Sequence, residues 1–345
     1  MVSLNLSDFC QKLFFGVSAS FLILSTSSTE VMSKDIGIEV IESIYNQLQI
    51  DDKWAIKEER GFTWWSHNLA QKISVSEGKN DLGLEMFKLQ SRTEFLKDLP
   101  SDQKSSELLG MYMRFSSLSG ITPHPTEENR LELVSTMWVH KDVKDFIELY
   151  FMLSSLIQNI EAHIMAPMYA ETLSAKVDMS AHPSNGKREE PDDMLGILED
   201  FVRPKGEEIS LWIGEEMNDL RSQINNSPNW FSMGDDTSLS AEFPYPGETS
   251  LMNFNTSEQN PRMGNGLLIT IRTRKGVVDT KTALDWNYQD HYGDKITQNI
   301  GSWSVADTGL AYVSFIPNVM FRRGATVNLG FWMMNKVMNL HKEFN

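Results

Sequence analysis

The order of helix-like and strand-like segments in the first half of this chain is repeated in its second half. The first half opens at Ile38–Leu48 and closes at Val143–Ile164, where apolar residues keep the three-and-four spacing of one helix face. The second half opens at Ile209–Ile224 and closes at Val327–His341 with the same spacing. Strand-like segments lie between the helices in both halves, for example from Trp230 to Phe315. This order predicts a scaffold made of two alike parts.

The predicted fold class is α+β, with two tandem α-β-β-β-(α)-β-β-α modules whose antiparallel sheets are each backed by helices. A chain of 345 residues exceeds the size at which one hydrophobic core usually keeps growing. We therefore expect a first module over residues 36–178 and a second module over residues 207–345. A polar linker loop over residues 179–206 would join them, and residues 1–35 would form a leader.

The strand period of two places several strands and leaves others open. Successive residues of Leu131–Val139 and of Leu310–Phe315 are assigned to opposite faces of a strand. Met111, Met113 and Phe115 alternate after a short helix that is expected to begin near Ser101. Residues 279–293 stand where the second half should have its own short helix, although they could also form a loop.

The predicted leader has two interpretations. Its apolar run, Leu13–Leu24, follows Lys12 and gives way to Ser25–Thr29, which resembles a signal peptide. The run is shorter than the roughly 20 apolar residues of a membrane-spanning helix, so no stable membrane span is expected. Asp8 cancels the charge of Lys12, and residues from Met32 read like a natural start. We expect a cytoplasmic protein, with export through the signal peptide as the alternative.

Charge and cysteine content exclude several classes of partner and cofactor. The chain has 31 Lys and Arg against 47 Asp and Glu, a net charge of -16. Such an excess opposes binding to nucleic acid or to an anionic membrane, because both need clustered cations. Cys10 is the single cysteine, so the chain forms no internal disulfide and no cysteine-based metal site. The histidines show no recognised ligand spacing, and we expect neither a metal nor a cofactor.

The element order of both halves, over residues 36–164 and 207–345, is similar to that of small proteins that resemble type III secretion chaperones, including the YbjN-like bacterial family. The resemblance lies in the pattern of elements and includes no residue motif. It implies a curved antiparallel sheet backed by helices and a role in binding other proteins. Insertions around Pro123 and Asn260 depart from the compact family pattern.

The most distinctive polar segment, Ser180–Asp193, is either a stiff hydrated linker or a binding loop. In the second interpretation four side chains converge on an anion, and two carboxylates cap a helix that begins near Met194. The four are His182, Asn185, Lys187 and Arg188, and the two are Asp192 and Asp193.

Two further pairs of residues are candidate binding groups. Trp64 and Trp65 are neighbours on a predicted strand, so their side chains point to opposite faces and one of them leaves apolar surface to be covered. Arg322 and Arg323 precede the final helix and could contact an anion at its amino end.

The sequence favours a non-enzymatic protein-binding module, either chaperone-like or regulatory, with a protein partner. It contains no Gly-x-Ser-x-Gly turn and no phosphate-cradling glycine loop, and we expect no catalytic residue. The alternative is an enzyme with a cryptic polar site in a cleft between the modules, using the segment His182–Asp193. The partner and the oligomeric state stay open.

Overall fold

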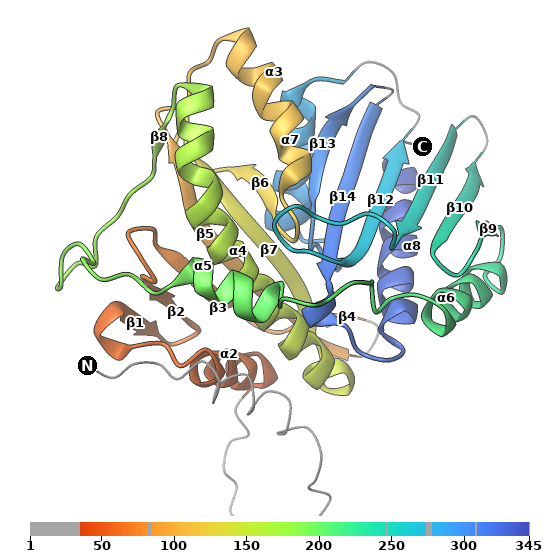
Figure 1. The fold of residues 1–345 in the computed structure, drawn as a ribbon, viewed down its shortest axis with the longest axis horizontal. Helices are drawn as coiled ribbons and strands as arrows, with labels where there is room; N and C mark the ends of the chain where they lie inside the picture. The colour runs from red at the N-terminus through yellow and green to blue at the C-terminus, as the bar shows by residue number, and fades with distance from the viewer. Residues whose placement is uncertain (1–34, 82–83, 246–247, 274–277, 308, 345) are drawn as a thin grey trace, which may run out of the picture. The chain divides into compact units, whose positions relative to one another are not determined.

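The computed structural model describes residues 35–81, 84–245, 248–273, 278–307 and 309–344. These residues belong to one compact unit. The predicted α+β fold is confirmed, since helices surround two antiparallel sheets (Figure 1). The predicted leader lies outside the described residues except for Asp35, which caps the first described helix by accepting a hydrogen bond from the Ile38 N–H at 2.8 Å.

The first half contains a sheet of eight strands and three α-helices. Its strands are β1 (Ala55–Glu58), β2 (Gly61–Trp64), β3 (Gln71–Val75), β4 (Lys79–Asp81), β5 (Leu84–Lys97), β6 (Gly120–Pro123), β7 (Leu131–Val139) and β8 (Lys176–Val177). Its helices are α2 (Ile36–Gln47), α3 (Gln103–Tyr112) and α4 (Lys144–Leu173), with short 3-10 turns η1 (Asp52–Trp54), η2 (Met113–Phe115) and η3 (Lys141–Val143).

A short helical connection leads to the second half, which contains a sheet of six strands. The connection holds α5 (Met194–Ile197) and the π-helical turn η4 (Leu198–Val202). The strands are β9 (Phe231–Gly234), β10 (Ser238–Tyr245), β11 (Glu248–Asn255), β12 (Gly266–Thr273), β13 (Ser302–Ala306) and β14 (Gly309–Pro317). The helices are α6 (Glu215–Asn225), α7 (Thr280–Tyr292) and α8 (Ala325–Phe344), with a 3-10 turn η5 (Asn318–Met320).

The two sheets have the same strand order. The main path of the first sheet is β1-β2-β3-β5-β7-β6, and the second, started from its outer edge, is β9-β10-β11-β12-β14-β13. Each short helix, α3 or α7, connects the fourth strand of its path to the inner edge strand, β6 or β13. Strands β7 and β14 therefore occupy corresponding places, and so do β5 and β12.

Each sheet packs one face against its own long helix. On the first sheet this face carries a buried polar network around Gln158 of α4, whose side-chain oxygen accepts hydrogen bonds from Ser91 at 2.6 Å and from Gln71 and Thr93 at 3.0 Å. On the second sheet the buried Lys336 of α8 lies 4.4 Å from the ring of Tyr312. Because side chains alternate along a strand, the residues between these positions point to the opposite faces.

Backbone hydrogen bonds at corresponding positions join the two sheets. The N–H of Thr136 in β7 donates to the carbonyl of Asn299 at 3.0 Å, and Asn299 returns a bond of 2.8 Å. The N–H of Phe315 in β14 donates to the carbonyl of Ser117 at 2.8 Å. Asn299 and Ser117 each lie three residues before an inner edge strand, so the same contact is made in both directions across the junction.

A buried ion pair fastens the loop between β11 and β12 to the first half. Glu161 of α4 is fully buried and lies 3.4 Å from Arg262, and its carboxylate also accepts the N–H of Ser117 at 3.2 Å. Arg262 donates a second hydrogen bond to the Phe115 carbonyl. Burial raises the pKa of Glu161, and the guanidinium acts in the opposite direction. Breaking one side of such a pair leaves a buried charge without compensation.

Three expectations differ from the structure. The alternating residues Met111, Met113 and Phe115 lie at the end of α3 and in η2, where the alternation follows a helical turn and not a strand. The helix expected from Ile209 begins only at Glu215, because Gly214 adopts a positive φ of 68° and the exposed Ile209 packs on no core. The expected polar linker contains α5 and η4, whose apolar side chains are buried at Met194, Leu198, Phe201 and Val202.

Arg262→Met should lower the free energy of unfolding by about 3–5 kcal/mol, because it leaves the buried Glu161 carboxylate without its cation. Urea unfolding followed by circular dichroism measures this loss. The double variant Glu161→Leu/Arg262→Met should recover part of it, since no buried charge is left. Arg323→Met is the matched control, because that exposed arginine pairs with the exposed Glu215 at 2.8 Å and should matter little. Equal losses of unfolding free energy in Arg262→Met and Arg323→Met would contradict a stabilising role of the buried Glu161–Arg262 pair.

Candidate functional site

The polar segment predicted as a binding loop begins with a proline-containing turn. Backbone hydrogen bonds join His182 and Gly186 in both directions, and Gly186 has a positive φ of 73°. The Nδ1 of His182 accepts the N–H groups of Ser184 at 3.2 Å and Asn185 at 3.1 Å. His182 therefore caps its own turn, and its ring packs edge-on against Trp65, with the centroids 4.9 Å apart.

The same arrangement recurs wherever a histidine or asparagine precedes proline in a described turn. Asn260 Oδ1 accepts the N–H groups two and three residues further on, at 2.9 and 3.1 Å. His124 Nδ1 does the same at 3.3 and 3.1 Å. These side chains satisfy backbone donors that the turn would otherwise leave without a partner.

Arg188 is held against the first sheet. Its guanidinium donates to the carbonyls of Trp65 at 2.6 Å and Ser66 at 3.0 Å, and it forms a bidentate pair with Asp192 at 2.9 and 2.7 Å. Burial raises the pKa of Asp192, and the hydrogen bond from Arg188 opposes that rise. The cation that could have met an external anion is thus already paired within the segment.

The other predicted site residues lie in several places. Asn185 donates to the Lys53 carbonyl at 2.5 Å, Asp193 caps α5 through the Gly196 N–H at 2.8 Å, and Lys187 is exposed. Trp64 donates to Gln71 at 2.7 Å inside the core, whereas Trp65 donates to Ser180 at 3.1 Å. Arg322 donates to backbone carbonyls and Arg323 pairs with Glu215, both beside the second sheet. The structure brings the loop residues together with Trp65 but not with the two arginines.

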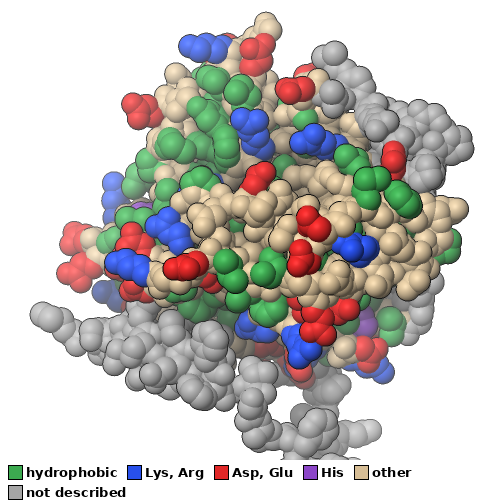
Figure 2. All heavy atoms as spheres, turned by 45° about the vertical axis from the view of Figure 1, so that its right-hand side comes forward, with side chains coloured by type: hydrophobic (Ala, Val, Ile, Leu, Met, Phe, Trp, Pro, Cys, Tyr) green, Lys and Arg blue, Asp and Glu red, His purple; other side chains and the backbone are tan. Residues whose placement is uncertain are grey.

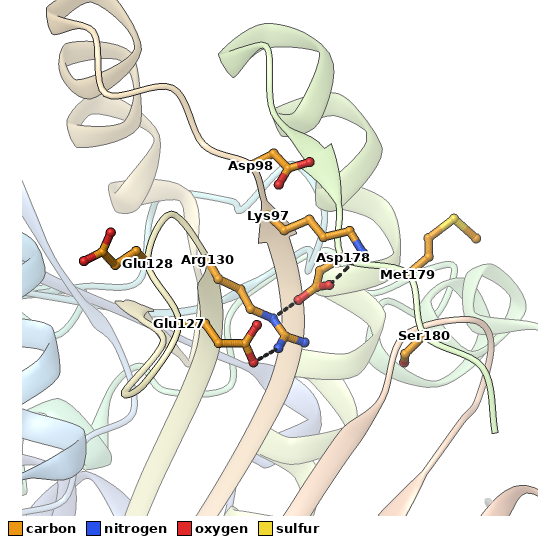
Figure 3. Close-up of a pocket in the computed structure, with 8 residues that line it drawn as sticks. All are labelled: Lys97, Asp98, Glu127, Glu128, Arg130, Asp178, Met179 and Ser180. Carbon is orange, nitrogen blue, oxygen red and sulfur yellow. Dashed lines mark hydrogen bonds and ion pairs between the residues drawn. The ribbon is translucent and has the colours of Figure 1, made fainter. Parts of the chain in front are cut away.

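A charged pocket of about 340 Å³ lies where β8 meets the first sheet (Figure 3). Its centre is Arg130, which pairs with Asp178, with Glu127 at 2.6 Å and with Glu94 at 3.0 Å. Lys97 pairs with Asp178 at 3.3 Å. Figure 3 shows Arg130 and Lys97 directed at Asp178, so both cations form ion pairs with carboxylates of the chain itself. These ion pairs hold the segment after β8 against the sheet, and they leave few charged groups in the pocket to bind a ligand.

A larger groove, of about 1080 Å³, lies on the face of the second sheet opposite α8. Its floor includes Thr270 of β12 and Val313 of β14, which are paired neighbours, and its wall includes Met111 of α3. The amino end of α7, at Asp279, closes one end. The floor positions alternate with the fully buried Ile269 and Ile271, whose side chains point to the α8 side.

The corresponding face of the first sheet is filled. There Gln90 donates to the His291 carbonyl of α7 at 2.8 Å, and Tyr292 of α7 donates to Glu132 at 2.6 Å. Arg92 pairs with the same carboxylate at 2.7 Å and lies over the Tyr292 ring. These long side chains occupy the space between α7 and the sheet.

Strand register shows why the second sheet stays open. Val134 of β7 pairs with Arg92, and the corresponding Val313 of β14 pairs with Thr270. Two residues before each valine stand Glu132 in the first sheet and Ala311 in the second. Small side chains thus replace the ion pair that fills the first face. Sequence reasoning missed these floor residues because serine, threonine, alanine and valine carry no motif.

The face of the molecule drawn in Figure 2 is mixed in charge. Figure 2 shows acidic and basic side chains scattered among uncharged ones, with hydrophobic side chains gathered in its upper left part. Three exposed apolar residues belong to α3, η2 and α4: Met111, Phe115 and Met168, with exposed fractions of 52%, 44% and 48%. Among the described residues no cluster of three or more potential metal ligands occurs, and no helix there has the length and apolar content to cross a bilayer.

The buried His67 packs against the half-buried His163 beside the polar network of α4. The rings of His67 and His163 lie 4.2 Å apart, and Ser66 lies 2.9 Å from Nδ1 of His67. Burial, with the charges of His163 and Arg188, lowers the pKa of His67 to about 3. Burial also lowers the pKa of His163. Both rings are therefore neutral in the folded protein at physiological pH, which suits packing.

Acid should destabilise the protein through His67. Between pH 6.5 and about 3 the unfolded chain binds a proton that folded His67 does not, so its contribution to stability falls as the pH falls. The loss is about 1.4 kcal/mol per pH unit for a fully buried group. His67→Gln should flatten the dependence of unfolding free energy on pH between 7 and 5, as measured by urea unfolding. An unchanged slope in this variant would show that His67 titrates alike in both states.

Comparisons with protein-family models, with curated proteins and with solved structures find no match to this chain. No residue role is therefore carried over from a relative, and the function is inferred from the groove and the residues that form it.

Proposed function

We propose that this protein binds a segment of another protein in the groove between α3 and the second sheet, and that its role is non-enzymatic. The observation that carries the proposal is the difference between two corresponding faces. The first sheet is covered by its own long helix on one face and by α7 on the other. The second sheet has the groove where the first has filled space.

The size and lining of the groove support a protein segment as its occupant. The volume of the groove, about 1080 Å³, lies slightly above the range of about 300–1000 Å³ that is usual for small-molecule sites. Met111 in the wall is half exposed, and methionine adapts to varied apolar partners. Exposed apolar residues gathered beside a concave surface are typical of interaction sites.

The chaperone-like role implied by the element order belongs to this proposal. The resemblance to secretion chaperones implies a sheet backed by helices that binds other proteins, and the groove on the second sheet supports such a role. The proposal includes a cytoplasmic location, in keeping with a chain whose single cysteine, Cys10, can form no internal disulfide.

The alternative of an enzyme that uses residues 182–193 gains no support from these contacts. His182 Nδ1 accepts two backbone N–H groups, so it is not available there to take a proton from a substrate. Arg188 and Asp192 neutralise each other. Among the described polar groups of the segment, Nδ1 of His182 and the Arg188–Asp192 pair hold the segment itself in place.

Site-specific photo-cross-linking tests the proposal. A benzophenone amino acid at position 111 should give a discrete cross-linked product in native cells, because this position lines the groove. The matched control is position 233, since Met233 is a methionine of similar exposure, 62% against 52%, on the outer edge strand β9. The products are compared by mass spectrometry. The proposal fails if position 111 gives no product, or only the products that position 233 also gives.

A further inference from the structure

The groove contains two arginines that differ from most other arginines of the chain. Six described arginines form ion pairs with carboxylates: Arg60, Arg92, Arg130, Arg188, Arg262 and Arg323. Arg114 and Arg272 both line the groove, both are exposed, and neither pairs with a carboxylate in the described part of the chain. Arg114 instead lies over the ring of Phe115, 5.0 Å from its centroid. Because neither guanidinium has a carboxylate partner among the described residues, both can pair with carboxylates of an occupant.

Two of the carboxylates that line the groove accept hydrogen bonds from other residues of the chain. Asp279 caps α7 by accepting hydrogen bonds from the Thr282 N–H at 2.8 Å and from its hydroxyl at 2.7 Å, which lowers the pKa of this carboxyl. Glu107 accepts a hydrogen bond from Gln103 at 2.7 Å. Asp307 is the third. Among the described residues that line the groove, Arg114 and Arg272 are the only cations, so they are its strongest hydrogen-bond donors.

The floor of the groove favours a helix over an extended strand. Strands β12 and β14 are each paired on two sides, β12 between β11 and β14, and β14 between β12 and β13. The edge strand β13, whose residues 304–306 also line the groove, contacts η2 and β6 of the first half. These strands favour recognition through side chains over strand addition, as when a helix lies in a groove. The first sheet already holds a helix, α7, on the corresponding face.

We propose that the groove binds an amphipathic α-helix of a partner protein, whose apolar face lies on the Val313 and Met111 side chains and whose carboxylates pair with Arg114 and Arg272. This inference rests on the proposed function and specifies the chemistry of the partner. A guanidinium that meets a carboxylate in a partly closed groove forms a stronger and more oriented pair than one in open solvent.

Two synthetic helical peptides test it on the full chain. Both are stapled, carry the same stripe of leucines, and differ only in having glutamate or lysine at the positions that flank the stripe. Fluorescence anisotropy measures their binding. We expect the glutamate peptide to bind at least tenfold more tightly than the lysine peptide, with an affinity that falls as salt is added. Arg114→Gln/Arg272→Gln should abolish this preference, whereas the exposed control Arg323→Gln should keep it.

Three results would overturn the inference: equal affinity for the two peptides, binding of neither, or a preference that survives in the Arg114→Gln/Arg272→Gln variant. Cross-linking from position 111 does not depend on charge, so it judges the proposed function separately. A specific cross-linked partner together with no preference between the peptides would retain the groove as a protein-binding site and reject the acidic helix.

Discussion

The junction between the two sheets depends on backbone hydrogen bonds that the corresponding strands β7 and β14 each donate to the other half of the chain. Thr136 and Phe315 stand at corresponding places in β7 and β14, and each donates to the chain three residues before the inner edge strand of the other half. Strands β7 and β14 extend past the start of their inner edge strands, so their backbone groups there would otherwise be unpaired, which favours uncontrolled pairing with other chains. The junction bonds use that capacity internally. On either side of them α3 contacts β13 and α7 contacts β6, where Asn287 of α7 donates to the Ile121 carbonyl at 3.0 Å.

A framework of this kind fixes where a groove can form but not whether it is filled. Both sheets meet the short helix of the other half on the face opposite their own long helix. In the first sheet the pair of Arg92 and Glu132, together with Tyr292, occupies the space. In the second sheet the corresponding strand positions are Thr270 and Ala311, which are too short to reach across. Side-chain size at two registered positions therefore separates a packed face from an open one, while the strand order is the same in both halves.

The sequence was sufficient for much of the fold, because strand-like and helix-like segments recur in both halves. The predicted strands Leu131–Val139 and Leu310–Phe315 form β7 and β14, which are buried on both faces, and the closing helices match α4 and α8. The same reasoning is wrong at Met111, Met113 and Phe115, where a period of two coincides with the end of a helix. It also extends the helix of the second half back to Ile209, because an apolar residue in a sequence carries no mark of its exposure. The junction bonds join backbone atoms, so no residue pattern predicts them.

The candidate site shows the same limit more sharply. The segment His182–Asp193 stands out in the sequence because it combines histidine, arginine and carboxylates, yet Nδ1 of His182, Arg188 and Asp192 already have partners within the chain. Arg188 faces Asp192 and two carbonyls, and His182 caps its own turn. Binding draws on hydrogen-bonding and charge capacity that folding has not already used, since a satisfied group must first lose its partner. Arg114 and Arg272 keep that capacity, and they lie where small residues leave room on the sheet. A polar side chain that is already paired within the chain stabilises the fold, and one that is not paired can bind another protein. Which side chains are paired depends on strand register and packing, which only the three-dimensional structure shows.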